Sequence, residues 1–126
     1  MRPLKISKKT KAYISLALVL LCTPVMAKGE DLSQVIHLAN QGFATAQYAS
    51  GLMYDNGEGV RQDYQKAFEW FTKAANQGFA TAQYASGLMY YNGEGVRQDY
   101  KKAKNFFRLS CDNGLQEGCD AYKDLN

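Results

Sequence analysis

The chain has 126 residues, of which 15 are basic and 12 acidic, and its formal net charge is +3 at pH 7. Five of the basic residues and none of the acidic ones precede position 28, so residues 28–126 carry a net charge of −2. This balance excludes the broadly basic surface that nucleic-acid binding requires, and the sequence KKAK at Lys101–Lys104 is interpreted as a solvated helix face. The length suits one domain of modest size.

The N-terminal segment is typical of a secretory signal peptide. Residues 1–11 contain five bases and no acid, and residues 12–22 form the apolar run AYISLALVLLC. Small residues follow, so we predict cleavage after Ala27. The apolar run is too short to span a bilayer, which takes about 20 residues, so we predict no membrane insertion after cleavage. A lipoprotein signal at Cys22 is the alternative, but Leu21 stands where such a signal has a small residue.

One phrase of fifteen residues, NQGFATAQYASGLMY, begins at Asn40 and again at Asn76. Over the first 25 positions of the two copies, the only difference is Asp55 in the first against Tyr91 in the second. A fixed period of this length is typical of solenoid proteins. We divide the chain into a signal peptide (1–27), an N-terminal half unit (30–39), repeat 1 (40–75), repeat 2 (76–111) and a C-terminal capping half unit (112–126).

Each repeat is predicted to form two helices. The first covers Ala44–Tyr54 in repeat 1 and ends at glycines that can adopt the left-handed conformation. Asp63 then offers a carboxylate to cap the second helix, Tyr64–Ala75. In that helix, apolar residues recur at helical spacing from Tyr64 through Phe71 to Ala75, which predicts one buried stripe.

The two half units are predicted to cover the ends of the repeats. Glu30–Ala39 aligns with a second helix and places Leu32, Val35 and Ile36 inward, whereas Leu115–Leu125 aligns with a first helix. A single helix pair cannot bury its apolar faces, but stacked pairs can. The sequence therefore predicts an all-α fold, a short α-solenoid of stacked antiparallel helix pairs with about six helices.

The motifs of the two copies identify a family. Repeat 1 contains Ala46-Gln47, Gly51, Tyr54, the turn Gly57-Glu58-Gly59-Val60, Asp63 with Lys66-Ala67, Trp70 and Lys73-Ala74-Ala75, and repeat 2 preserves most of these. This pattern resembles the Sel-one-like repeat, a relative of the tetratricopeptide repeat, over about Glu30–Tyr122. The sequence departs from the pattern at Ser50 and Ser86, where the family usually has leucine, and at Phe106, which replaces the tryptophan.

The C-terminal sequence CDNGLQEGC is similar to the cysteine-rich exported branch of the same family. In that branch, two cysteines eight positions apart join the end of one helix to the start of the next, which implies a disulfide between Cys111 and Cys119. Two cysteines in an exported chain are consistent with an oxidising compartment. We therefore expect a periplasmic or secreted protein with this disulfide, and the alternative is two free thiols.

The sequence shows no recognisable catalytic or metal-binding set. The single histidine, His37, has no nucleophile pattern nearby, and one histidine with two cysteines falls short of a zinc site. Some cysteine-rich relatives are described as β-lactamases or penicillin binders, but no serine here has a lysine three positions later. The turn DNGEG at Asp55 lacks the calcium-loop pattern. We predict no cofactor, no metal and no catalytic residue.

Protein binding is the remaining function, because stacked helix pairs expose a long binding face. On a helical wheel, one stripe of the first helices is left over, which we call the stripe: Thr45, Tyr48, Leu52, Asp55, Thr81, Tyr84, Leu88 and Tyr91. Its residues either anchor a partner protein or peptide or pack between repeats. We expect an exported interaction module. The alternatives are a cell-wall or β-lactam-directed binding protein or hydrolase, and a small inhibitor or immunity-type partner.

Overall fold

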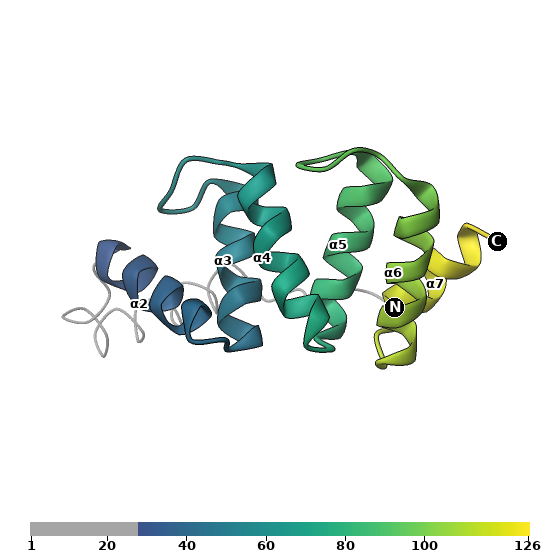
Figure 1. Ribbon diagram of the computed structural model, residues 1–126, viewed down its shortest axis with the longest axis horizontal. Helices are drawn as coiled ribbons and strands as arrows, with labels where there is room; N and C mark the ends of the chain where they lie inside the picture. Colours follow the sequence, from purple (N-terminus) through teal and green to yellow (C-terminus); the bar gives the residue numbers. More distant parts are fainter. Residues whose placement is uncertain (1–27) are drawn as a thin grey trace, which may run out of the picture. The chain divides into compact units, whose positions relative to one another are not determined.

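The computed structural model describes residues 28–126, so the predicted signal peptide and the cleavage after Ala27 lie outside the described residues. The described part forms six helices and no strand, which confirms the predicted all-α solenoid of helix pairs (Figure 1). None of these helices combines the length and apolar character needed to cross a membrane. The helices are α2 (Lys28–Asn40), α3 (Ala44–Asn56), α4 (Tyr64–Asn76), α5 (Ala80–Asn92), α6 (Tyr100–Asp112) and α7 (Gln116–Asp124).

The helix ends are fixed by the residues that the sequence pattern predicts. Gly57 follows α3 with a φ of 72°, in the left-handed region that favours glycine. The Asp63 side chain caps α4 by accepting a hydrogen bond from the Lys66 backbone N–H at 3.1 Å, and Asp99 caps α6 in the same way, with Lys102 as donor at 3.0 Å. The two repeats therefore start their second helices with the same aspartate cap, and they end their first helices at the equivalent glycines Gly57 and Gly93.

Small residues let the two helices of a repeat approach closely. A Cβ atom built on Gly51 of α3 would lie 2.5 Å from the Phe71 ring of α4, and one built on Gly87 would lie 2.6 Å from the Phe107 ring. Phe71 and Phe107 are both almost fully buried. Glycine is thus required at this position of the first helix because the aromatic ring of the second helix occupies the space.

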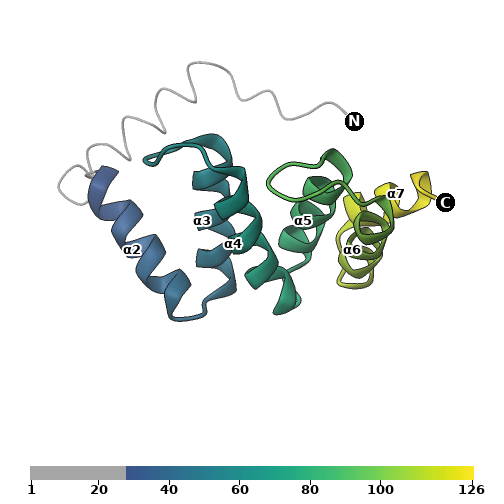
Figure 2. The ribbon, with the colours of Figure 1, turned by 45° about the horizontal axis from the view of Figure 1, so that its top comes forward.

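Successive repeats pack through alanine-rich surfaces. Ala74 and Ala75 of α4 form a buried cluster with Ala82 of α5, and α3, α4, α5 and α6 follow one another side by side (Figure 2). Tyr64, which the periodicity places on the apolar stripe, is instead 40% exposed. Its hydroxyl accepts a hydrogen bond from the Gln62 side chain, so the first residue of α4 faces water.

Buried glutamines join each first helix to the end of the preceding helix. The Gln47 side chain donates to the Ala39 carbonyl at 3.2 Å, and the Gln83 side chain donates to the Ala75 carbonyl at 3.1 Å. Gln77 extends this network by donating to the Gln47 side-chain oxygen at 2.8 Å. These bonds satisfy polar groups that would otherwise be costly to bury between repeats.

Helix α2 covers the N-terminal end less closely than we expected. Leu32, Val35 and Ile36 are half-buried, and Leu38 is 43% exposed. In the 36-residue register, Leu38 occupies the position of Ala74.

Candidate functional site

Six of the eight stripe residues line one groove between α3 and α5. The groove has a volume of about 260 Å³. Phe71 of α4 and Met89 of α5 also contribute to its lining. We call it the α3–α5 groove, and its stripe residues are Tyr48, Leu52, Asp55, Thr81, Tyr84 and Leu88.

The tyrosine rings of the groove are held by the core on one side. The Tyr48 ring packs against Phe71 and Phe79, with centroid distances of 5.5 Å and 5.4 Å, and the Tyr84 ring packs against Phe107 at 5.6 Å. Both tyrosines are only half-buried. The two uses considered for the stripe are thus compatible, because each ring packs between helices and also lines the open groove.

Two carboxylates give the groove a negative character. Asp55 ends the stripe on α3, and Glu94 joins it from the turn that follows α5. Burial raises the pKa of Asp55, and the negative charge of Glu94 raises it further. Burial likewise raises the pKa of Tyr48, with a second contribution from Asp55. The charges of Asp55 and Glu94 therefore act on the same small volume.

Two stripe residues lie outside the groove. Thr45 is exposed near the start of α3. Tyr91, the counterpart of Asp55, is 40% exposed and packs edge-on against Tyr100 at 5.2 Å. It lines a second hollow of about 200 Å³, whose other residues are Leu88, Phe107, Ala121, Asp124 and Leu125. Asp55 and Tyr91, which are the one difference within the first 25 positions of the copies, thus line two different hollows.

Glu94 and Asp124, which supply carboxylates to the two hollows, are not predicted as site residues from the sequence. Glu94 has an identical counterpart, Glu58, which is exposed outside the α3–α5 groove. The turns that contain Glu58 and Glu94 have the same sequence. Only the position of the second turn in the fold distinguishes Glu94 from Glu58. The sequence did contain a signal for Asp124. This residue lies on the C-terminal half unit, which is predicted to form a helix that covers the end of the repeats.

A further hollow of about 520 Å³ lies over α6 and α7 and has a basic character. Lys104 lies over the Tyr122 ring at 5.6 Å, and Arg108 pairs with the exposed Asp112 at 3.2 Å. The full lining is Asp99, Lys101, Lys102, Lys104, Asn105, Arg108 and Tyr122. Lys101 and Lys102 are exposed and Lys104 is half-buried, so the KKAK segment forms a largely solvated face of α6.

The three buried serines considered for catalysis are not brought together with His37, whereas Ser33, one turn away on α2, lines the same hollow as His37. Ser50, Ser86 and Ser110 are fully buried, and the hydroxyls of Ser50 and Ser110 donate to the backbone carbonyls of Ala46 and Ala80. His37 is exposed on α2 and accepts a hydrogen bond from Gln41 at 3.0 Å. A serine nucleophile needs a base within hydrogen-bond reach, which none of these serines has among residues 28–126.

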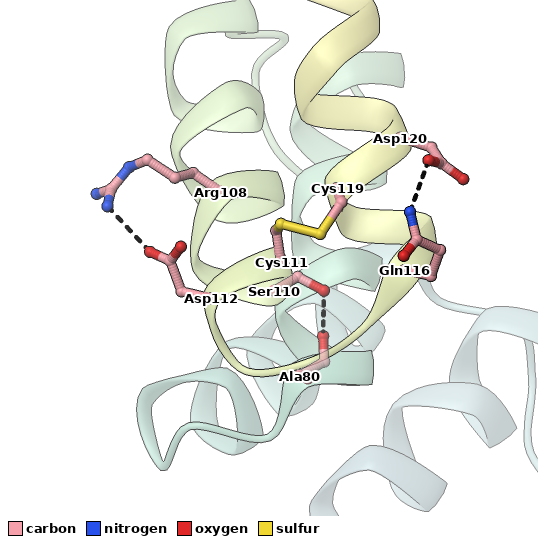
Figure 3. Close-up of a disulfide and its surroundings, with 8 residues drawn as sticks. All are labelled: Ala80, Arg108, Ser110, Cys111, Asp112, Gln116, Cys119 and Asp120. Carbon is pink, nitrogen blue, oxygen red and sulfur yellow. Dashed lines mark hydrogen bonds and ion pairs between the residues drawn. A yellow bond between two sulfur atoms is a disulfide. The ribbon is translucent and has the colours of Figure 1, made fainter.

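The same part of the chain contains no group of three acidic, histidine or cysteine side chains that could hold a metal ion. Cys111 at the end of α6 is bonded to Cys119 of α7 (Figure 3). Close beside this bond, a Cβ atom built on Gly118 would lie 2.5 Å from the Ser110 hydroxyl. The disulfide therefore joins α6 to α7 beside a close contact between the two helices.

Known proteins share both the repeat and the fold. Residues 44–79 and 80–115 match the model of the Sel1 repeat. The structure is similar to a Sel1 repeat protein from Oxalobacter formigenes, with a TM-score of 0.77 and 35% identity over 79% of this chain and 29% of that one. It is also similar to a protective antigen of uropathogenic Escherichia coli strains that displays an SLR fold, with a TM-score of 0.74 and 33% identity over 89% of this chain and 24% of that one.

A third similar structure is cysteine rich protein B of Helicobacter pylori, with a TM-score of 0.74 over 91% of this chain and 97% of that one. Its identity of 19% shows a common fold alone. The chain spans less than a third of the length of the first two structures. A search of curated proteins found no match.

Proposed function

Because matches to the Sel1 repeat cover more than half of its length, the chain belongs to the Sel1 repeat family, and we propose that it acts as an exported protein-interaction module. Sel1 repeat proteins are generally scaffolds that mediate protein–protein contacts. Stacked helix pairs suit this function because neighbouring first helices present a continuous surface to a partner.

The α3–α5 groove is the observation that carries the proposal. It combines two tyrosine rings, two leucines and two carboxylates in an open hollow of about 260 Å³. Tyrosine is enriched among residues that dominate binding energy, because its ring buries a large area and loses little conformational entropy. Packing against Phe71, Phe79 and Phe107 holds the two rings in place before a partner arrives.

Export is supported by two independent features. Residues 1–27 have the charge and apolar pattern of a signal peptide. The Cys111–Cys119 disulfide suits an oxidising compartment, since thiols in the cytosol are kept reduced. We therefore place the interaction in the cell envelope or outside the cell.

The test removes both groove tyrosines and measures partner recovery. The variant Tyr48→Ala/Tyr84→Ala deletes the ring surfaces, whereas Arg61→Ala/Arg97→Ala changes two exposed residues at equivalent positions of the two turns. Proteins cross-linked to each variant in an envelope extract are quantified by mass spectrometry. We expect the arginine variant to retain the partners and the tyrosine variant to lose at least nine-tenths of them.

Circular dichroism of each variant verifies that the helix content is intact, because both rings also pack on the core. Equal recovery by a folded tyrosine variant and by the unmodified protein would exclude the groove as the binding site. A second double variant, Leu52→Asn/Leu88→Asn, keeps both aromatic contacts and tests the same surface.

A further inference from the structure

The α3–α5 groove carries two carboxylates that no basic side chain of residues 32–126 neutralises. Among residues 32–126, the only salt bridge joins Arg108 and Asp112, on α6. Asp55 and Glu94 have no Lys or Arg nitrogen within 4.0 Å in this part of the chain. Charges of the same sign at the edge of a partly desolvated groove attract a cation from outside more strongly than fully hydrated charges do.

The position of Asp55 adds to this negative character. Asp55 lies in the last turn of α3, which ends at Asn56 and is capped by Gly57. The unpaired carbonyls at a helix C-terminus carry partial negative charge, so that lysine, arginine or histidine is the favoured residue there. An aspartate at this position works against the helix, and Tyr91 in the second repeat shows that the fold does not need it.

The tyrosine rings of the groove are free to receive a cation. Elsewhere in the described part of the chain, lysine ammonium groups lie over the rings of Tyr54, Trp70, Tyr90 and Tyr122 at 4.3–5.6 Å. No such pair involves Tyr48 or Tyr84 among these residues. The electron-rich ring faces and the two carboxylates therefore favour the same kind of ligand group.

The size of the groove indicates how much of a partner it can hold. Its volume of about 260 Å³ is below the range of about 300–1,000 Å³ typical of small-molecule pockets. Leu52, Leu88 and Met89 are among the apolar residues of the lining, and the two acids are its negatively charged residues. Such a groove suits one or two side chains that project from an otherwise external segment.

We infer that the α3–α5 groove binds a partner protein through a segment in which a lysine or arginine stands next to an apolar side chain. The apolar side chain lies on the leucines, and the cation lies between the tyrosine rings and the carboxylates of Asp55 and Glu94. This inference rests on the proposed interaction function and specifies the chemistry of the partner.

The experiment selects ligands without assuming a partner. A random-peptide display library is panned against the purified protein, expressed as the full chain. Selected peptides are synthesised in two forms, one unchanged and one with each lysine or arginine replaced by norleucine or citrulline. Fluorescence anisotropy measures their affinity for the unmodified protein, for Asp55→Asn/Glu94→Gln, and for the control Glu58→Gln, which changes the exposed counterpart of Glu94.

We expect the selected peptides to share a lysine or arginine beside leucine, isoleucine or an aromatic residue. The neutral peptide and the Asp55→Asn/Glu94→Gln variant should each weaken binding about tenfold, because an interaction with a charged partner group contributes on this scale. Glu58→Gln should bind as the unmodified protein does. Increasing the salt concentration should weaken binding of the cationic peptide and leave that of its neutral form unchanged.

Two results would overturn the inference in distinguishable ways. Peptides that lose affinity for Tyr48→Ala/Tyr84→Ala but bind Asp55→Asn/Glu94→Gln within about twofold of the unmodified protein would leave the groove as a binding site and refute the cationic partner. Failure to select any peptide, or selection of peptides that bind the tyrosine variant equally well, would refute the groove itself and the proposed function with it.

Discussion

At the scale of single residues, identical residues at equivalent positions of the two repeats have different surroundings. Gly59 and Gly95 occupy the same position of the turn and adopt nearly the same φ, 72° and 68°. A Cβ atom on Gly59 would touch only the end of the Met53 side chain at 3.7 Å, whereas one on Gly95 would collide with the backbone carbonyl of Tyr64. The second turn therefore rests on the first residue of α4.

This difference predicts unequal effects of alanine at the two positions. Gly59→Ala should cost about 1–2 kcal/mol, because an L-residue is strained in the left-handed region. Gly95→Ala should cost roughly 1–3 kcal/mol more, because the backbone it meets cannot move aside as a flexible side chain can. Urea unfolding of the two variants measures both values. Equal destabilisation would show that the contact between the second turn and α4 does not contribute to stability.

The sequence predicts the left-handed glycines but not this difference. The letters around Gly59 and Gly95 are the same for several positions on both sides, so local sequence contains no information about the neighbouring repeat. The same holds for two buried serines. The Ser50 hydroxyl donates to the Ala46 carbonyl at 2.9 Å, whereas the equivalent hydroxyl of Ser86 has no partner among the described residues.

At the scale of helices, the disulfide occupies the position of a recurring hydrogen bond. The pairs Gln47–Ala39 and Gln83–Ala75 join residues eight apart at the start of α3 and α5. One repeat length later, the equivalent residues are Cys119 and Cys111, which are also eight apart. A covalent bond thus replaces a side-chain to backbone bond at the junction of α6 and α7.

The residues beside the disulfide change together. The buried pair Ala74 and Ala82 between α4 and α5 becomes Ser110 and Gly118 between α6 and α7. The Ser110 hydroxyl occupies the space that a Cβ atom on Gly118 would need, and it donates to the Ala80 carbonyl at 2.8 Å. Ser110 is larger than Ala74 and Gly118 is smaller than Ala82, so the close packing between the two helices is conserved.

This equivalence predicts that glutamine can partly replace the disulfide. Cys111→Ala/Cys119→Ala should destabilise the protein by roughly 2–3 kcal/mol, the value that the loop-entropy model gives for so short a bridge. Cys111→Ala/Cys119→Gln restores the residues found in the preceding repeat and should recover about 0.5–1.5 kcal/mol through the hydrogen bond. Thermal unfolding of both variants without reductant measures the difference.

Cys111→Ala/Cys119→Asn is the matched control, because its shorter side chain has the same amide but does not reach the carbonyl. If the glutamine variant were no more stable than the alanine variant, the two kinds of link would not be interchangeable. The pairing of the cysteines followed from family resemblance, whereas its equivalence to the glutamine bonds emerged only when the helices were placed in register.

At the scale of the whole molecule, the period of 36 residues predicted most of the fold. Because of this period, equivalent residues of each repeat lie on the same helix faces. The helix pairs, their caps and the order of stacking therefore follow from one repeated sequence. The N-terminal half unit lacks that phrase, and there the prediction was weakest. Leu38 stands in the place of Ala74, and the three apolar residues expected inward are only half-buried.

The site was predicted in part for the same reason. The helical wheel identified the stripe, and six of its residues line the α3–α5 groove. It did not include Glu94, because that residue belongs to a turn and reaches the groove only through the stacking of the second repeat. A periodic pattern on one helix predicts which side chains share a face, but it does not predict which turn completes the site.

The net charge of the protein also depends on whether the predicted signal peptide has been removed. The full sequence has a net charge of +3, and residues 28–126 have a net charge of −2. The five bases before Ala27 would serve export and then be removed. The net negative charge that remains has the same sign as the α3–α5 groove and would favour encounters with a cationic partner over long distances.

Export therefore predicts a defined covalent form of the protein. Intact-mass spectrometry of the protein from the periplasmic or secreted fraction of its producing cell should give the mass of residues 28–126 less two hydrogen atoms. Alkylation before reduction should add nothing, because Cys111 and Cys119 are bonded. After reduction, two alkyl groups should be added. A protein that keeps Met1 through Ala27 and remains in the cytosol with three reactive thiols, Cys22, Cys111 and Cys119, would contradict export and with it both proposed locations of the interaction.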